Sequence, residues 1–369
     1  MSLEGQTAAV TARSALFMFL GLALSLTSPA FDAVLLPQQG PWAQAADDLS
    51  LGLIAAYAQS NRTSSNPTEL RFYDSSQGNI RALYASAVHD GADFIIGPLE
   101  KDKVDALLSD GQGFAVKTLL LNRSTQAPLA QSWQFSLSLE DEIPTLVTTA
   151  RRAGIEHALI VYDDDGNYAQ RAHTWAQAWR AAGGSVIEEA ALPAHATLMK
   201  TLQSLLFSTS EQKRGHGRHA RRVILQTPRP IDALFIACGQ RNGSQIYPLL
   251  QHLHRNLPRY ALSSAVDMPS RRTQWQDLIG LVYTELPGLL QAPDSLRLFD
   301  VLMHQRSSDQ RLFVMGMDSW ALARQLGTDH PSWPYQGLTG RIEAQQGLLQ
   351  RQLPASRIAG DGPHLIEQP

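Results

Sequence analysis

Short apolar runs alternate with amphipathic stretches along most of this sequence, and no other feature constrains its fold as strongly. The clearest runs stand at residues 33–37, 93–96, 157–162 and 233–237. Between such runs apolar residues recur with helical spacing, as in Ile80, Leu83, Tyr84 and Ala87, which is typical of a core-facing helix. The alternation predicts βαβ units and parallel sheets, and therefore an α/β fold class.

The length of the chain indicates more than one compact unit. It has 369 residues, and chains of this length usually divide into domains with separate hydrophobic cores. Hydrophobic residues make up 44% of the sequence, which is enough to form such cores. We therefore expect two Rossmann-like lobes, with a first crossing near Ser136. Lobe 1 is expected to comprise residues 31–136 plus about 264–330, and lobe 2 residues 137–263 plus about 331–360.

Periodicity also places further elements within each lobe. Helices are expected around residues 42–58, 143–150 and 168–179, and strands at 70–73, 116–121 and 133–136. Gly154 is positioned to end a helix in the left-handed conformation. Trp175 and Trp179 recur at helical spacing, so we interpret them as core residues rather than as a ligand platform.

Residues 1–30 have the pattern of a secretory signal peptide. Arg13 precedes an apolar run over 15–26, and residues 28–30 supply the small side chains that a signal peptidase reads. We predict cleavage after Ala30, a periplasmic location and no stable membrane span after cleavage. The alternatives are an uncleaved amino-terminal anchor and a core helix of a cytoplasmic protein.

Composition and motif content argue against several functional classes. The formal net charge of −3 supplies no basic field for nucleic acid, so no nucleic-acid partner is expected. The single cysteine, Cys238, cannot form an internal disulfide, and its apolar surroundings predict a buried thiol. Nucleophile-elbow, phosphate-loop, dinucleotide and zincin patterns are missing from the sequence. We therefore expect no enzymatic activity, no catalytic residues and no cofactor.

One acidic segment has the alternate oxygen spacing of a calcium loop. Asp163, Asp165 and Asn167 fit that spacing, but Tyr168 stands where the loop needs glycine and Thr174 where it needs glutamate. We predict instead a strand-to-helix turn in which Asp165 or Asn167 caps the helix, and no metal site.

Loops that follow the predicted strands form the candidate cleft, because open α/β sheets bind ligands at the carboxyl ends of their strands. Several of these loops combine a small polar side chain with a helix amino terminus, which attracts anions. Turn formation and helix capping are the alternative roles for each residue. The candidate cleft residues are Gln39, Trp42, Asp74, Ser75, Ser76, Gly97, Pro98, Asn122, Ser124, Asp163, Asp165 and Gln240.

The segment from Ser208 to Arg222 is unusually basic, with five lysine or arginine residues. We expect an exposed, mobile loop there. A solvated insertion and a docking site for an acidic partner are the two interpretations of its charge.

The placed segments resemble the type I periplasmic-binding-protein superfamily and, within it, the carboxyl-terminal domain of the LppC/LpoA family of penicillin-binding-protein activators. The resemblance extends over nearly all residues after 31. Of the groups of residues that carry the resemblance, given below, the last two are the more specific to the activator family. The final stretch, about Gln345-Gln346-Gly347, predicts a hairpin. The groups are 34–37 with Gly40, 72–74, 92–99, 231–235, 315–320, and 337–342 with Gly347 and 351–354.

The resemblance implies a two-lobed, Venus-flytrap architecture and a non-enzymatic role in peptidoglycan synthesis through contact with a class A penicillin-binding protein. The family's amino-terminal helical domain and lipobox cysteine find no match in this sequence, so we do not expect outer-membrane anchoring. The alternative is a solute receptor of an ABC-type transporter that closes on a small molecule such as an amino acid or muropeptide. A degenerate enzyme is a third interpretation.

Overall fold

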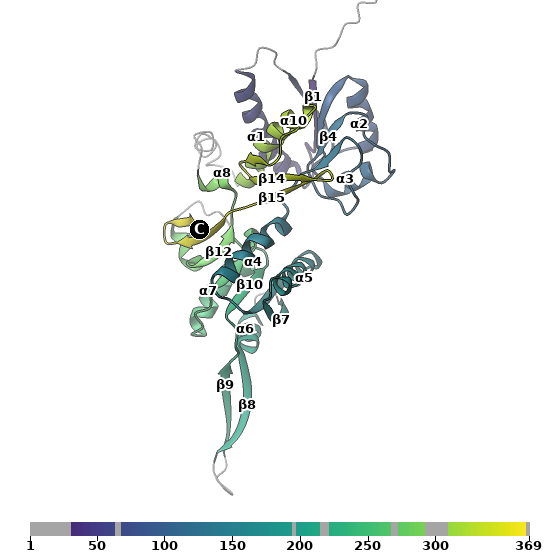
Figure 1. The fold of residues 1–369 in the computed structure, drawn as a ribbon. Helices are drawn as coiled ribbons and strands as arrows, with labels where there is room; N and C mark the ends of the chain where they lie inside the picture. Colours follow the sequence, from purple (N-terminus) through teal and green to yellow (C-terminus); the bar gives the residue numbers. More distant parts are fainter. Residues whose placement is uncertain are drawn as a thin grey trace, which may run out of the picture.

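The computed structural model describes residues 31–62, 68–193, 197–214, 221–266, 272–291 and 309–366. These residues form two α/β lobes, one above the other in Figure 1, each built on its own largely parallel sheet. The expected α/β fold class is confirmed. The expected signal peptide over residues 1–30 lies outside the described residues. None of the described helices is both long enough and apolar enough to cross a membrane.

The upper lobe is built on an eight-stranded sheet in the order β13-β14-β15-β5-β4-β3-β1-β2. The described helices that pack on this sheet are α1 (Ala43–Asn61), α2 (Ile80–His89), α3 (Lys101–Leu108) and α10 (Gln310–Gly327). The strands are β1 (Phe31–Leu36), β2 (Glu69–Asp74), β3 (Ala92–Ile96), β4 (Lys117–Leu120), β5 (Ser132–Gln134), β13 (Tyr335–Gly337), β14 (Gly340–Gln345) and β15 (Leu348–Gln352).

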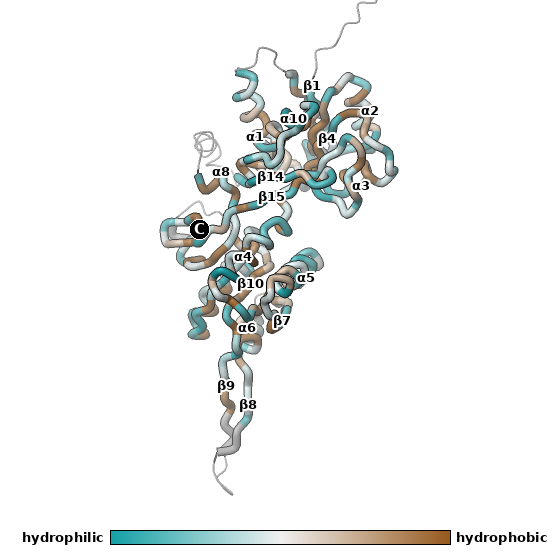
Figure 2. Tube along the Cα trace, viewed as in Figure 1, coloured by the Kyte–Doolittle hydropathy of each residue, from teal (hydrophilic) through white to brown (hydrophobic). Residues whose placement is uncertain are grey.

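Strand β1 is buried on both faces because helices cover the sheet on both sides. Its side chains alternate between the faces. Val34 and Leu36 join the core under α1 and α10, whereas Ala33 and Leu35 join the core under α2 and α3. Figure 2 shows the resulting apolar colouring along the central strands of this lobe.

The lower lobe is built on a seven-stranded sheet in the order β17-β16-β12-β11-β10-β6-β7. Its strands are β6 (His157–Asp163), β7 (Ser185–Leu192), β10 (Ala233–Ala237), β11 (Arg259–Ala261), β12 (Leu281–Thr284), β16 (Ala355–Ala359) and β17 (Gly362–Leu365). Helices α4 (Ile143–Arg152) and α5 (Gly166–Ala181) cover one face, and α6 (Leu198–Leu206) and α7 (Gln240–His252) the other.

Local predictions in this lobe agree with the structure. Trp175 and Trp179 are fully buried and pack around Phe235 of β10, as expected for core residues. Gly154 has a φ of 77°, the left-handed conformation expected at the end of α4. Cys238 is buried, and burial raises the pKa of its thiol.

Counted over the described elements, the chain passes between the lobes three times: after β5, between β12 and α10, and from β15 to β16. The first crossing lies near Ser136, where it was expected. The later division differs from the sequence-based one, because β12 belongs to the lower sheet and β13 to β15 belong to the upper sheet. Segment 264–330 is therefore divided between the lobes, and so is segment 331–360. Strand β15 joins the upper sheet by pairing with β5, a contact that no local sequence pattern encodes.

The expected hairpin about Gln345-Gln346-Gly347 is confirmed. Strands β14 and β15 pair antiparallel, and Gln346 and Gly347 both have positive φ, 49° and 82°. A Cβ on Gly347 would lie 2.7 Å from the Pro128 side chain, so this turn position requires glycine for space as well as for conformation.

The basic segment is not a loop throughout, so that expectation is wrong. Strands β8 (Phe207–Arg214) and β9 (Arg221–Pro228) pair antiparallel as a separate two-stranded ribbon, which we call the arm. The arm extends from the lower lobe, away from both sheets (Figure 1). Residues 215–220, between its strands, lie outside the described residues.

Candidate functional site

The candidate cleft residues lie at the carboxyl ends of strands, in one group on each lobe. The loops after β1 and β2 contact each other: the side-chain amide Nε2 of Gln77 lies 3.5 Å from Oε1 of Gln39. Gln39 and Trp42 are exposed, and 52% of the Trp42 surface faces solvent. Of the upper group, these two residues therefore offer the most surface to a ligand or partner.

Asp74 and Ser76 organise the loop after β2. The backbone amides of Gln38 and Ser76 each donate to Oδ1 of Asp74 at 2.9 Å. Hydrogen bonding from Ser76, and then from Gln38, lowers the pKa of Asp74. The Asp74 carboxylate thus links the loops that follow β1 and β2. This is turn formation, the alternative to ligand binding given in the sequence analysis.

Ser75 is buried and faces a carboxylate on the neighbouring loop. Its Oγ donates to Oε2 of Glu100 at 3.1 Å, and Nζ of Lys103 lies 2.6 Å from Oε1 of the same carboxylate. Lys103 also donates to the Ser75 carbonyl oxygen. Gly97 and Pro98 lie immediately before this group and are buried. A Cβ on Gly97 would lie 2.2 Å from the Leu35 carbonyl oxygen, so glycine is required there for close packing.

Asn122 and Ser124 also have partners within the upper lobe. Nδ2 of Asn122 donates to the Leu99 carbonyl oxygen at 2.9 Å. Ser124 Oγ donates to Asp105, and its amide donates to Oε1 of Gln134 at 2.9 Å. These contacts hold the strand ends of the upper sheet together.

The lower group contains Asp163, Asp165 and Gln240. Asp163 accepts from the Gly239 amide at 2.8 Å and from Nδ2 of Asn242 at 2.6 Å. Asp165 is the N-cap of α5 and accepts from the Asn167 amide at 2.8 Å, which confirms the predicted capping turn. Gln240 is exposed at the first turn of α7. The described residues contain no cluster of ligands suited to a metal ion.

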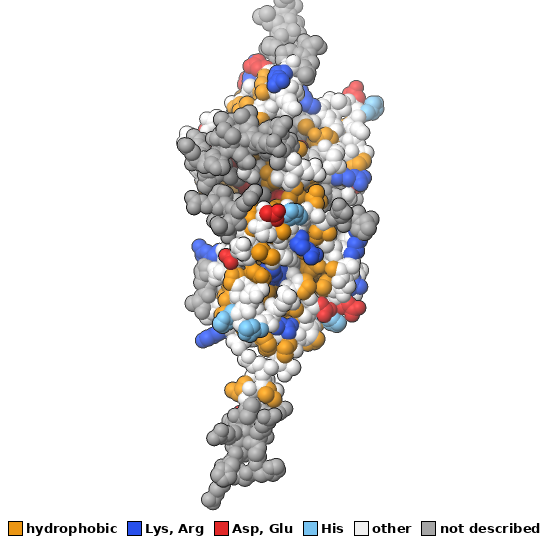
Figure 3. Space-filling model, turned by 90° about the vertical axis from the view of Figure 1, so that its left-hand side faces the viewer, with side chains coloured by type: hydrophobic (Ala, Val, Ile, Leu, Met, Phe, Trp, Pro, Cys, Tyr) orange, Lys and Arg blue, Asp and Glu red, His pale blue; other side chains and the backbone are white. Residues whose placement is uncertain are grey.

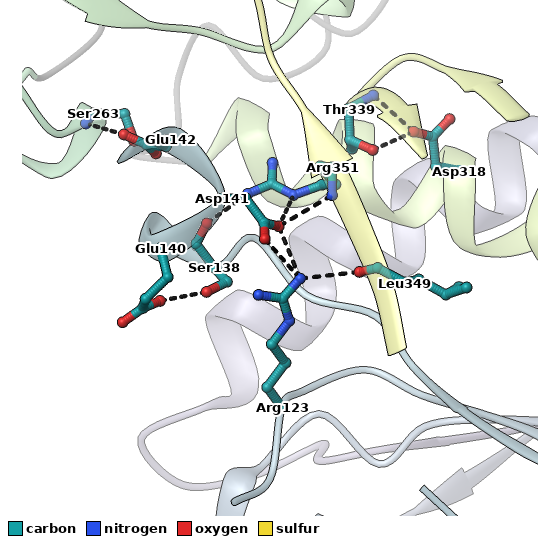
Figure 4. A network of polar contacts seen from close by, with 10 residues as sticks. All are labelled: Arg123, Ser138, Glu140, Asp141, Glu142, Ser263, Asp318, Thr339, Leu349 and Arg351. Atoms are coloured by element: carbon teal, nitrogen blue, oxygen red, sulfur yellow. Dashed lines mark hydrogen bonds and ion pairs between the residues drawn. The ribbon is translucent and has the colours of Figure 1, made fainter. Parts of the chain in front are cut away.

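A buried ion network at the first crossing was not predicted from the sequence (Figure 4). Asp141 lies in the short 3-10 helix η1 (Leu139–Glu142), and its carboxylate faces two arginines of the upper lobe. Nη2 of Arg123 lies 2.9 Å from Oδ1, and Nε of Arg351 lies 3.3 Å from Oδ2. Arg123 also donates to the Leu349 carbonyl oxygen, and Arg351 to that of Ser138.

The next residue, Glu142, connects the same segment to the lower lobe. The amide of Ser263 donates to Oε2 of Glu142 at 2.7 Å, and its hydroxyl to Oε1 at 2.5 Å. Two consecutive carboxylates therefore hold the crossing, one to each lobe. Burial raises the pKa of Glu142 to about 7, against the opposing effect of the Ser263 hydrogen bonds.

Burial also sets the direction of the pKa shifts of Asp141 and Arg351 in this network. Burial raises the pKa of Asp141 although Arg123 and Arg351 act to lower it. Burial also lowers the pKa of Arg351. An ion pair with both partners desolvated in this way contributes little net stability, but loss of one partner leaves an uncompensated buried charge.

The second crossing contains a further buried pair. Glu285, whose side chain is 1% exposed, lies 2.6 Å from Nη2 of Arg311 on α10. Nη2 of Arg311 also approaches the Val266 carbonyl oxygen of the lower lobe at 3.4 Å. Two features of the sequence point weakly to the ion pairs at the first crossing. The acidic run 140–142 follows the predicted crossing near Ser136, and Arg351 belongs to one of the groups that carry the family resemblance.

A cavity of about 680 Å³ lies in the upper lobe, away from the candidate cleft. It is bounded by α1, α10, β13 and the short helix α8 (Pro287–Leu290), and none of the candidate cleft residues lines it. Within it Asp318 accepts from the Leu338 and Thr339 amides at 2.9 and 2.7 Å. This carboxylate is therefore already occupied by the turn between β13 and β14.

Comparison with known sequences gives one family and a set of named relatives. The family described as "LppC putative lipoprotein" matches residues 6–355. The penicillin-binding protein activator LpoA of an Enterobacter species is 26% identical over 321 residues, which covers 78% of this chain and 43% of the relative. The LpoA of Vibrio vulnificus is 26% identical over 323 residues, which covers 83% of this chain and 53% of the relative. The chain thus spans about half the length of these relatives.

Solved structures show the same fold. The LpoA (YraM) C-domain from Haemophilus influenzae, described as a regulator of PBP1A, has a TM-score of 0.70 at 18% identity and covers 92% of this chain and 100% of that chain. A "putative branched-chain amino acid ABC transporter" from Chromobacterium violaceum has a TM-score of 0.66 at 23% identity and covers 89% of this chain. Both likenesses support the two-lobed, periplasmic-binding-protein-like architecture.

Proposed function

The chain belongs to the LppC family, and on that premise we propose that it is a non-enzymatic periplasmic protein that activates a class A penicillin-binding protein by direct contact. One observation carries the proposal: the relatives that align with most of this chain have the name of penicillin-binding protein activator. A regulator of a peptidoglycan synthase needs a stable surface rather than a reacting group.

The site geometry supports a contact role over ligand-driven closure. Ser75, Asn122 and Asp163 of the candidate cleft are each engaged by a neighbour in their own lobe. The crossing at Asp141 and Glu142 is held to both lobes by buried groups. A receptor that closes on its ligand needs differential affinity for two lobe arrangements, whereas these contacts favour one arrangement.

The test is activation of the cognate synthase. The purified chain is added to the class A penicillin-binding protein of the same genome, and glycan polymerisation and peptide crosslinking are measured. We expect stimulation that saturates with chain concentration. Absence of both stimulation and binding would refute the proposal.

The receptor hypothesis is tested separately, because the transporter fold shared with the Chromobacterium protein keeps it open. The candidate cleft residues would then bind a small molecule between the lobes. We expect amino acids and muropeptides to leave the melting temperature unchanged. A shift of several degrees with one of these compounds would favour the receptor.

A further inference from the structure

The arm is an anchored projection of the lower lobe. At its base Phe207 packs against the hydrophobic core of that lobe, and the Arg229 amide donates to the Leu206 carbonyl oxygen at 2.9 Å. Nε2 of Gln203 on α6 donates to Oε1 of Gln226 on β9 at 3.1 Å. Its strands pair only with each other within the described residues, so each strand has one edge without a strand partner. Free edges of this kind are templates for pairing with another chain.

Most of the described side chains of the arm are exposed, including one large apolar side chain, whereas Phe207 and Leu225 are half-buried. Ser208, Ser210 and Glu211 are exposed, and Ile224 is 68% exposed. Covering an aliphatic side chain of this size is favourable, because it removes apolar surface from water. The exposed Ile224 side chain is therefore unfavourable in an isolated arm, and a partner that covers this side chain removes that cost.

The charge of the arm is equally unsuited to an isolated ribbon. Its paired strands carry four cationic residues and one carboxylate, in a chain of net charge −3. The register places Lys213 opposite Arg222 and Arg214 opposite Arg221, at the end distant from the lobe. Like charges directly opposite each other destabilise an antiparallel pair. By contrast, the face in Figure 3 mixes both signs of charge over the two lobes.

We propose that the arm docks an extended, acidic segment of the synthase, which pairs along the free edge of β9 and covers Ile224. Backbone pairing supplies affinity and the cationic positions select an acidic sequence, as in strand addition generally. This proposal rests on the proposed function, because it assigns the contact surface for the same partner.

The arm suits a protein segment better than an anionic membrane. On the face of the ribbon that carries Ile224, its neighbours Thr209, Glu211 and Gln226 are polar and exposed. A membrane-surface element needs a broad apolar face, which one isoleucine does not supply. Lipid headgroups also cannot satisfy the backbone groups of a strand edge in register.

The deciding variant is Lys213→Glu with Arg221→Glu. It lowers the charge of the ribbon by four and pairs one acidic with one basic residue at each of these two register positions, an arrangement that favours the antiparallel pair. Binding of the full chain to the cognate class A penicillin-binding protein is measured by surface plasmon resonance. We expect affinity to fall roughly tenfold or more, and Ile224→Ser to weaken binding as well.

The matched control is Arg152→Glu with Arg357→Glu, which makes the same charge change at exposed positions outside the arm. We expect its affinity to match that of the parent. Equal affinity of the arm variant and the parent would overturn the docking role and leave the proposed function standing. A parent that fails to bind the synthase would overturn both. Unchanged synthase binding with lost binding to phosphatidylglycerol–phosphatidylethanolamine vesicles would overturn the proposal in favour of a membrane contact.

Discussion

At the scale of single residues, the most consequential feature is the pair of consecutive carboxylates at the first crossing. Asp141 contacts arginines of the upper lobe, and Glu142 contacts Ser263 of the lower lobe. Both side chains are buried, and burial raises both pKa values. The charge of Glu142 therefore depends on pH near neutrality.

Glu142→Gln should alter the pH dependence of stability. The folded-state pKa of Glu142 is raised to about 7 from 4.5, so its contribution to stability is fully present below pH 4.5 and is lost as pH rises through about 7. The loss is on the order of 3 kcal/mol. We expect the melting temperature of the variant to rise relative to the parent between pH 5 and pH 8. The glutamine oxygen still accepts from the Ser263 amide, its Nε2 donates to the Ser263 hydroxyl oxygen, and no charge is buried.

Glu140→Gln is the control for this experiment. Burial opposes the shift of Glu140, but hydrogen bonds from Ser138 and contact with Arg171 lower its pKa. Its contribution is present above pH 4.5 and is lost only as pH falls further. The difference between this variant and the parent should be constant from pH 5 to pH 8. A constant difference for Glu142→Gln over the same range would contradict the assignment.

At the scale of elements, the contact between α1 and α10 is closer than side chains normally permit. A Cβ on Gly316 would lie 2.0 Å from the Leu49 carbonyl oxygen, and one on Gly52 would lie 1.8 Å from that of Phe313. The two helices thus meet through backbone at reciprocal glycines. This contact sets the position of α10, and with it Arg311 and the cavity residue Asp318.

Gly316→Ala should separate these helices. Because the neighbouring atoms belong to backbone, they cannot move aside cheaply, and we expect a loss of about 3 kcal/mol or more in unfolding free energy. Gly327→Ala, in the same helix but with no atom within 4 Å of its Cβ position, should be neutral or stabilising by up to about 1 kcal/mol. Equal denaturation midpoints for the two variants would refute the close contact.

At the scale of the whole molecule, three crossings connect the lobes and buried ion pairs hold the first two. This arrangement favours one relative orientation of the lobes. A fixed orientation suits a protein that presents a surface, which is the role proposed for this chain.

Asp141→Ala should loosen that orientation. Arg351, 1% exposed at its side chain, would remain buried without its carboxylate, which costs about 3–5 kcal/mol. We expect a lower melting temperature and a broader distance distribution in small-angle X-ray scattering. A variant with the scattering profile and melting temperature of the parent would show that the network does not hold the lobes.

The sequence by itself determined what depends on local periodicity and local turn chemistry. It located the strand at 233–237 and the core role of Trp175, the cap at Asp165 and the left-handed Gly154, and it indicated the family. Only the tertiary structure decided the sheet to which β15 belongs, the contact of Arg351 with Asp141 and the close approach of α1 and α10. These features join residues far apart in the chain, and their geometry depends on how the lobes pack rather than on any neighbour in sequence.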